Sequence, residues 1–357
     1  MKEFYKQYHG YSIRCCGAAD LTSLMLFIDK HWAKEHILSV SRKLMAWQYY
    51  NRRWNRYNFL MGIDDKNGDI LGIISYIPTY IYDMSIGDND NFVWLSVWKV
   101  RDDYAKTALG IQLLSAVFEL EDTKNVGTVG NNQAVEPLYR VMKFKTGVLE
   151  HYYIANDNMH ECSLLNGCAT KHNNVSDDKI RIQQIESENE LLAFFENAKY
   201  MESIYPIKRA RYYINRYIKH PFYKYNLFWI VNNGIKTVLL VCRTVQAQGA
   251  KAIRIVDING AISIISGAYG AFQKMLNQSN AEYIDMYCHG LDDNLLVALG
   301  FTRKTVESGV TVPNYFEPYT ASNVEIRFAY HVADDKQYYI FKGDCDQDRP
   351  NQKIWEE

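Results

Sequence analysis

Three aspartates stand within five residues near the C-terminal end of the sequence. Asp344, Asp346 and Asp348 alternate with other residues, and Arg349 follows them directly. Alternating aspartates are typical of a calcium loop, but that loop needs a glycine at its sixth position and a glutamate at its twelfth. Arg349 and Trp355 stand there instead. The sequence therefore predicts no metal site, and two interpretations stay open: a solvated terminal turn or a polar ligand-binding segment.

Two further carboxylates lie among apolar residues of predicted strands. Asp257 lies close to the end of one such strand, and Asp285 lies inside the next. A carboxylate in a buried strand needs a partner, and Arg243 and Arg254 are the expected ones. A structural ion pair and, for Asp257, a catalytic general base are equally compatible with the sequence.

A glycine pair precedes one of the predicted helices. The segment Gly267-Ala268-Tyr269-Gly270-Ala271 opens the helix expected at 268–277. The backbone N–H groups at a helix N-terminus can hold a phosphate, so the segment is a candidate cradle. Most glycine pairs of this kind serve only a turn, and that alternative remains.

The elements that must position these residues are predicted from hydrophobic periodicity and turn residues. In the first half we expect the strands 11–16, 59–63, 70–77, 92–100 and 126–130, and the helices 21–31, 39–51, 105–120 and 135–142. In the second half we expect the strands 227–231, 237–243, 253–258, 283–288 and 338–342, and the helices 188–200, 268–277 and 294–299.

The two halves repeat one order: hairpin, strand, helix, strand, helix. Tyr57-Asn58-Phe59-Leu60 opens the first hairpin and Tyr225-Asn226-Leu227-Phe228 opens the second. Such internal similarity indicates two copies of one unit. Residues 156–179 are rich in Asn, Asp, His and Ser and have no sustained period, which is typical of a linker. We therefore expect an N-terminal domain at 1–155, a linker at 156–179 and a C-terminal domain at 180–357.

The end of the first unit carries a more specific pattern. Asn132, Leu138-Tyr139 and Phe144 have the spacing of a motif that closes the GNAT (Gcn5-related N-acetyltransferase) fold, which this segment resembles. The resemblance implies an α/β (α+β) protein of two tandem GNAT-like units, each a mixed, mostly antiparallel sheet flanked by helices. It also implies that Tyr139 is a catalytic general acid that protonates a leaving thiolate. Simple packing of Tyr139 against the sheet is the alternative.

A loop for the thioester donor can be placed by the same resemblance. The family's phosphate-binding loop corresponds to 105–110, where only Gly110 matches it cleanly. Acyl-CoA, such as acetyl-CoA, is the implied co-substrate. In the second unit, His289 and Leu296 stand where the motif has Asn and Tyr, so which copy binds the thioester stays open. The residues expected to bind the donor are Val100, Lys106, Ala108, Gly110 and Asn132.

The C-terminal block resembles a signature of GNAT-like proteins of bacterial O-antigen and capsular polysaccharide biosynthesis. The segment 342–351 carries it, with Cys345 in place of a glycine, and 313–318 resembles the same proteins. The resemblance implies acyl transfer from acyl-CoA or an acyl carrier protein to the amine of an amino sugar, in nucleotide-linked form. The expected substrate-binding residues are Arg243, Asp285, His289, Asp344, Asp346, Asp348, Arg349 and Asn351.

Two other functions fit the same pattern. Aminoacyl-tRNA-dependent (Fem-like) transferases also use paired GNAT units, and a local basic patch could serve tRNA; its residues would be Arg209, Arg211, Arg216, Lys219 and Lys224. A non-catalytic sugar-binding protein is the third possibility, supported by the degenerate loop at 105–110.

The composition argues against several classes of binding partner and several cellular locations. Of the 357 residues, 48% are hydrophobic and 23% charged, which is typical of a globular chain. Lys and Arg number 40 against 41 Asp and Glu, so no net field favours nucleic acid. No apolar run approaches the roughly 20 residues of a membrane span, and no signal peptide is evident. We expect a soluble cytoplasmic protein without a metal; the sequence leaves its oligomeric state open.

Overall fold

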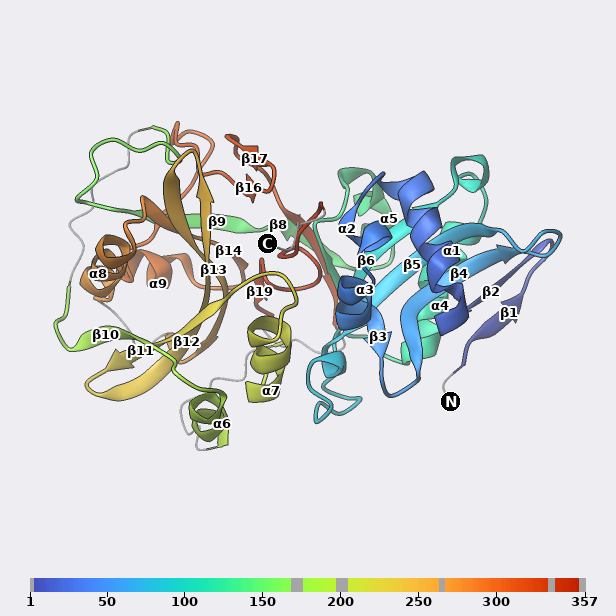
Figure 1. Cartoon of the computed structure of the whole chain (residues 1–357), viewed down its shortest axis with the longest axis horizontal. Helices are drawn as coiled ribbons and strands as arrows, with labels where there is room; N and C mark the ends of the chain where they lie inside the picture. Colours follow the sequence, from blue (N-terminus) through green and yellow to red (C-terminus); the bar gives the residue numbers. More distant parts are fainter. Residues whose placement is uncertain (1–2, 168–175, 197–204, 263–266, 333–337, 353–357) are drawn as a thin grey trace.

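The computed structural model describes residues 3–167, 176–196, 205–262, 267–332 and 338–352. It contains two large mixed sheets, each with helices on both faces, lying side by side along the long axis of the molecule (Figure 1). The predicted fold class is confirmed. Among the helices of these ranges, none has both the length and the apolar character that crossing a membrane requires.

The first sheet has one parallel strand pair, β6 with β7, and antiparallel pairs elsewhere. Along the sheet the order is β1 (Tyr5–Gln7), β2 (Tyr11–Cys16), β4 (Arg56–Asp64), β5 (Ile70–Pro78), β6 (Val93–Val100), β7 (Val126–Val129), β18 (Arg327–His331) and β8 (Lys145–Val148), with β3 (Tyr50–Asn51) paired to β4.

Helices bury both faces of this sheet. One face packs against α1 (Leu21–Phe27), α2 (Ile37–Val40) and α3 (Arg42–Tyr49), and the other against α4 (Leu109–Glu121) and α5 (Glu136–Val141). Successive residues of β4 alternate between the two cores: Phe59 and Met61 face α1 and α3, whereas Leu60 faces α4. A strand that is buried on both sides is apolar at every position, which explains the continuous runs in the sequence.

The second sheet repeats the plan. Its order is β10 (Ile180–Gln184), β11 (Asn226–Asn232), β12 (Ile235–Ala247), β13 (Ala250–Gly260), β14 (Tyr283–His289), β9 (Glu150–Ala155) and β15 (Thr302–Arg303), with β19 (Ile340–Phe341) paired to β14. Its helices are α6 (Glu188–Glu196), α7 (Ala210–Tyr213), α8 (Tyr269–Ser279) and α9 (Asp293–Ala298). A short hairpin, β16 (Tyr315–Phe316) and β17 (Tyr319–Thr320), stands apart from both sheets.

Each sheet contains a strand from the other half of the sequence. β9 lies between β14 and β15 in the second sheet, although the sequence places 150–155 in the first unit. β18, from the second half, lies between β7 and β8 in the first sheet. In Figure 1, green β9 accordingly runs among the yellow and orange strands. One hydrophobic core also joins side chains of α3 and β4 to side chains of α7 and β12. The two units are therefore interlocked.

Most predicted elements occur within a few residues of the expected positions, with one clear difference in the pair β12 and β13. β12 and β13 extend to Ala247 and from Ala250, beyond the predicted 237–243 and 253–258. Their turn is Gln248-Gly249, in which both residues have positive φ (52° and 78°). A two-residue turn of that conformation matches strand twist and lets both strands continue, but Gln-Gly is a weaker sequence signal than Asn-Gly. The predicted helix 105–120 begins only at Leu109.

Candidate active site

The parallel pair β6 and β7 separates after two residue pairs. Val93 pairs with Val126 and Trp94 with Gly127, and the rest of β6 and β7 has no partner across this gap. A cavity of about 410 Å³ lies there, which we call the first notch. It is lined by residues of both strands, of α5 and the turn before it, of the segment between α1 and α2, of β16 and of the C-terminal segment: Trp32, His36, Ser96, Val97, Trp98, Thr128, Val129, Gly130, Asn131, Asn132, Val135, Tyr139, Tyr315, Asp346, Gln347, Arg349 and Asn351.

A β-bulge shapes the wall of the notch on β6. Ile74 pairs with Trp98 and Tyr76 with Leu95, so β6 has one more residue than β5 over this stretch. The Val97 N–H donates to Ser75 Oγ at 2.8 Å. A bulge bends the strand and turns neighbouring side chains to new directions. Here it brings Ser96 and Val97 to the cavity.

The donor loop predicted from the sequence lies beside the notch. A Cβ on Gly110 would be 3.7 Å from the Trp98 ring, and Trp98 lines the cavity, so the first turn of α4 is adjacent to it. The cavity lining includes Asn132 of the expected donor-binding residues, but not Val100, Lys106, Ala108 or Gly110.

The loop before α4 also carries two carboxylates. Asp102 pairs with Lys99 at 2.7 Å and Asp103 with Arg101 at 2.7 Å. These pairs neutralise the acids next to the backbone donors of the first helical turn, while Lys106 stays exposed. A phosphate can therefore approach without meeting an unpaired carboxylate.

Tyr139 is delivered to the notch by a capped helix. Asn132 Oδ1 accepts a hydrogen bond from the Ala134 N–H at 2.9 Å, which begins the turn that leads into α5. The Tyr139 side chain is 3% exposed and packs on Phe144, with 5.0 Å between ring centroids. Burial raises the pKa of the Tyr139 phenol above its usual value, so the phenol stays protonated. No hydrogen-bond partner for its hydroxyl occurs in the described residues, which leaves that proton available to a ligand.

The C-terminal segment forms the opposite wall. Cys345 Sγ donates to the Leu95 carbonyl of β6 at 3.1 Å, and Ser96 Oγ donates to Asp346 Oδ2 at 2.8 Å. Arg349 Nη2 donates to Asp346 Oδ2 at 3.0 Å. Burial opposes ionisation of Asp346, but Arg349 and these donors hold its pKa below the usual range. The interpretation of this block as a solvated turn is wrong, because residues 342–346 and 348–350 are buried between the units.

His36 completes the charged part of the wall. Its Nε2 lies 3.0 Å from Arg349 Nη1, and its Nδ1 accepts from the Leu38 N–H at 3.1 Å. Burial, and then the neighbouring Arg349, lower the pKa of His36 to about 3. His36 is therefore neutral near pH 7, and the positive charge at this wall belongs to Arg349.

The remaining predicted site residues lie away from the first notch. Asp257 and Asp344 both contact Lys208, at 2.8 and 2.7 Å, in a fully buried cluster, and Tyr217 donates to Asp257 at 2.7 Å. Burial chiefly raises the pKa of Asp257 to about 6. The structure thus gives Asp257 and Asp344 structural partners and places neither at the cavity.

Ion pairs also engage the other candidates. Arg243 bonds Asp348 at 3.1 Å, and Tyr225 donates to the same carboxylate. Arg254 bonds Asp285 at 2.7 Å with both side chains fully buried, as the structural interpretation of the sequence expected. His289 lies 3.6 Å from Glu150 and packs on Phe328.

The second unit has the corresponding notch between β13 and β14, but the chain fills it. These strands pair over 253–255 and 284–286 and then separate. β19 pairs with Cys288 and His289, the Lys342 N–H donates to the Tyr287 carbonyl, and the Gly343 N–H donates to the Val256 carbonyl at 2.7 Å. Residues 340–343 therefore bridge both strands of the second notch.

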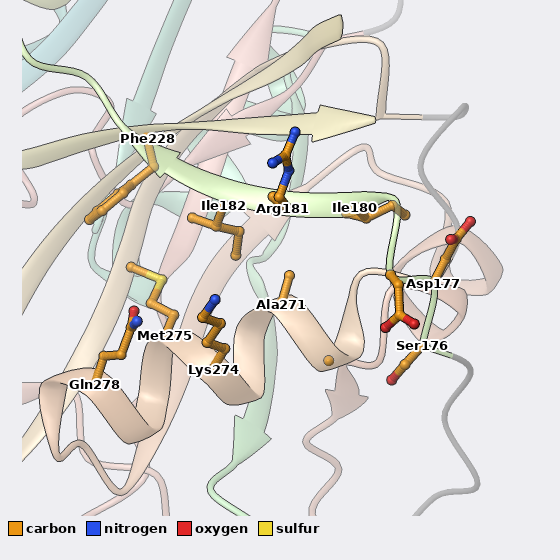
Figure 2. A pocket seen from close by; sticks show the side chains of 12 residues that line it. Ser176, Asp177, Ile180, Arg181, Ile182, Phe228, Ala271, Lys274, Met275 and Gln278 are labelled. Atoms are coloured by element: carbon orange, nitrogen blue, oxygen red, sulfur yellow. The ribbon is translucent and has the colours of Figure 1, made fainter. Parts of the chain in front are cut away.

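The glycine pair at 267–271 is also covered. The Asp177 N–H donates to the Gly267 carbonyl at 3.0 Å, and Ser176 Oγ lies 2.9 Å from the position of a Cβ on Gly270. Figure 2 shows the groove of about 430 Å³ between β10 and α8, with Ser176 and Asp177 at the end where the helix begins. A carboxylate stands where a phosphate would approach, so this cradle is not open.

Several cavity residues had no signal in the sequence. Trp32, Ser96 and Trp98 come from segments that carry no motif, whereas Tyr315 lies on β16 within the segment 313–318 that a sequence resemblance had singled out. Gln347 packs on Gly130, which has φ of +82°. Only the three-dimensional meeting of these segments gives them a shared surface. Groups of three or more His, Cys, Asp or Glu side chains that suit a metal ion do not occur in the described ranges.

Comparison with known proteins identifies the fold. No protein-family model matches the chain, and no curated protein matches it. A GCN5-related N-acetyltransferase from Anabaena variabilis superposes with a TM-score of 0.55 at 10% identity, over 91% of this chain and 73% of that one. One from Kribbella flavida gives 0.51 at 10% identity, over 92% and 71%. These solved structures, together with the two helix-flanked mixed sheets, show that the chain has the GNAT-like fold.

Proposed function

We propose that the chain is an N-acyltransferase of the GNAT type that uses the first notch. The observation that carries the proposal is a cavity between two diverging parallel strands, lined by the buried carboxylate of Asp346 and by the protonated phenol of Tyr139, which has no hydrogen-bond partner among the described residues. Beyond Trp94 and Gly127 the two strands no longer bond each other, although Cys345 Sγ donates to the Leu95 carbonyl, and such a gap suits the amide-rich arm of a thioester donor such as acyl-CoA or an acyl carrier protein.

Residues of the first notch can donate and accept the two protons that the reaction moves. A neutral amine attacks the thioester carbonyl, the C–N bond forms and the C–S bond breaks. Tyr139 gives its proton to the departing thiolate, and the proton of the attacking amine passes to Asp346. Among the cavity-lining residues of the described structure, Asp346 is the one carboxylate. Proton exchange with solvent restores both side chains.

For the acceptor we propose an amino sugar, in nucleotide-linked form. Trp32, Trp98 and Tyr315 offer flat apolar surfaces, and Asn131 and Asn351 offer amide donors and acceptors to hydroxyl groups. A sugar ring with one amine presents both kinds of surface. The connection to surface polysaccharide rests on the resemblance of the C-terminal block alone.

The direct test is release of thiol from acyl-CoA in the presence of amino sugars. The protein is incubated with acetyl-CoA and, in turn, free and nucleotide-linked amino sugars; the product is identified by mass, and the thiol is measured by a colorimetric reagent. We expect acyl transfer to a sugar amine, and a rise in melting temperature with acetyl-CoA by mass action. Absence of donor binding together with absence of transfer for every acyl chain tested would refute the proposal.

A tRNA-dependent reaction gains no support from the patch that suggested it. Arg216 is 2% exposed, and Arg209 is engaged with Asp90 and with the Ser85 carbonyl. The five basic residues therefore do not form one accessible surface.

A further inference from the structure

A second cavity, of about 360 Å³, lies where α3 and the following residues meet the turn after α7. It is separate from the first notch in its lining. Three aromatic rings, Trp47, Tyr50 and Tyr82, contribute to its wall, together with two cations, Arg52 and Lys219. Neither aspartate nor glutamate is among its lining residues in the described structure. The cavity is therefore aromatic and electropositive.

The two cations are available to a ligand. Arg52 is exposed. Lys219 lies 3.9 Å from Glu188, with both side chains largely solvent-accessible, and a pair of that kind contributes little free energy. An incoming phosphate can replace Glu188 without a large loss.

A buried arginine stands directly behind the aromatic wall. The Arg216 guanidinium lies 5.3 Å from the Trp47 ring centroid and 5.8 Å from that of Tyr82. Its Nη2 donates to the Gly343 carbonyl at 2.9 Å, whereas its Nε and Nη1 have no hydrogen-bond partner in the described residues. A fully buried cation with two unsatisfied N–H groups is costly.

His220 adds another unsatisfied donor beside the same ring. It packs edge-on against Trp47 at 4.4 Å, and its Nδ1 accepts hydrogen bonds from the Phe222 and Tyr223 N–H groups. Because Nδ1 is the acceptor, the ring proton is on Nε2, which has no partner in the described residues. The unsatisfied groups of Arg216 and His220 are thus all donors, and what they lack is an acceptor.

We propose that this cavity is a binding site for a nucleotide, an aromatic ring joined to phosphate. The ring stacks on Trp47, Tyr50 or Tyr82, since every nucleobase has a face that stacks on aromatic side chains. The phosphate lies between Arg52 and Lys219 and adds negative charge on the side of Arg216. The site uses none of the residues assigned to acyl transfer, so it stands or falls independently of that proposal.

Calorimetric titration of the full chain with uridine diphosphate and adenosine diphosphate tests the site, with uridine and inorganic pyrophosphate as separate arms. We expect at least one diphosphate nucleotide to bind, and both partial ligands to bind at least about tenfold more weakly, because each makes only half of the contacts. Acetyl-CoA added to the nucleotide-bound protein distinguishes the nucleotide of an acyl donor, which displaces the probe, from a separate nucleotide, which stays bound.

Matched variants locate the binding. Combined Arg52→Ala and Lys219→Ala should weaken nucleotide binding at least about tenfold. Arg53→Ala with Lys224→Ala changes exposed neighbours outside the cavity and should alter it less than about twofold. Where the probe stays bound in the presence of acetyl-CoA, neither pair should alter thiol release from acetyl-CoA. Arg216→Met, if its circular dichroism is native, should lose the nucleotide-dependent rise in melting temperature.

Three results would overturn the site: no binding of either nucleotide at millimolar concentration, equal loss in both variant pairs, or full affinity in a folded Arg216→Met protein.

Discussion

The two notches of this protein are built in the same way, but the first is open and the second is filled by the chain. In each unit, two parallel strands pair over a few residues and then separate, and a β-bulge lies on the strand at one side of the gap. The first notch holds a cavity, whereas residues 340–343 fill the second. One short segment makes the difference, because 340–343 closes the second notch and 345–351 continues into the wall of the first. A site can thus be lost in one copy while the segment that closes it helps to build the other.

Tyr139→Phe should have the largest effect, because it removes the buried phenol proton that we assign to the leaving thiolate. We expect the transfer rate to fall about 10²–10⁴-fold with the melting temperature nearly unchanged. The measurement is kcat beside thermal unfolding. Tyr153→Phe is the matched control, since the Tyr153 hydroxyl is buried in the second sheet and has no partner in the described residues. Near-normal turnover of Tyr139→Phe would assign that ring to packing alone.

Two aspartates of the block, Asp346 and Asp348, should separate catalysis from stability. Asp346→Asn removes the carboxylate of the first notch, and we expect transfer to fall about 10²-fold. Asp348→Asn leaves the buried Arg243 without its closest partner, which should cost about 3 kcal/mol of unfolding free energy. The rate per folded molecule should then stay the same. Equal effects of the two variants on both quantities would contradict the division of the block between the two notches.

A methyl group added in each unit should report how tightly each notch is filled. A Cβ on Gly343 would lie 2.3 Å from the Tyr217 hydroxyl and 2.6 Å from the Val256 carbonyl oxygen, so Gly343→Ala should destabilise the protein by about 1–3 kcal/mol. Gly110→Ala meets nothing closer than 3.6 Å and lies in the first turn of α4. It should be neutral or stabilising by up to about 1 kcal/mol. Denaturant unfolding measures both, and a tolerated Gly343→Ala would show that the second notch is loosely filled.

The last comparison concerns acid stability at the first notch. The folded pKa of His36 is lowered to about 3 from an ordinary 6.5, so below pH 6.5 the unfolded chain takes up a proton that the folded chain does not. Its contribution is complete above pH 6.5 and is lost as the pH falls toward 3. His36→Asn keeps an acceptor for the Leu38 N–H at the start of α2 and removes the titration.

Melting temperatures of the His36→Asn variant should therefore fall less between pH 6.5 and 4 than those of the unmodified protein. Above about pH 7.5 the difference in melting temperature between the two proteins should no longer change with pH. Parallel curves over the whole acid range would place the acid-sensitive group elsewhere.

The sequence by itself determined the local elements and the repeated order, because periodicity, turns and caps act over a few residues. Asn132, Tyr139 and Phe144 are on one short capped helix and its exit, and the resemblance of this segment to the GNAT closing motif had grouped them. The pair Arg254 and Asp285 was also predictable, since a carboxylate in an apolar strand requires a cation nearby.

Only the tertiary structure decided the strand exchange and the path of the C-terminal segment. β9 and β18 have the composition of any buried strand, and nothing local says which sheet they join. From the sequence, the aspartates of the block could be either solvated or buried, because a buried charge needs a partner from a distant part of the chain. The partners are Lys208 for Asp344, Arg243 for Asp348, and Ser96 together with Arg349 for Asp346. Which notch stays open depends on those long-range partners, and therefore on the folded chain as a whole.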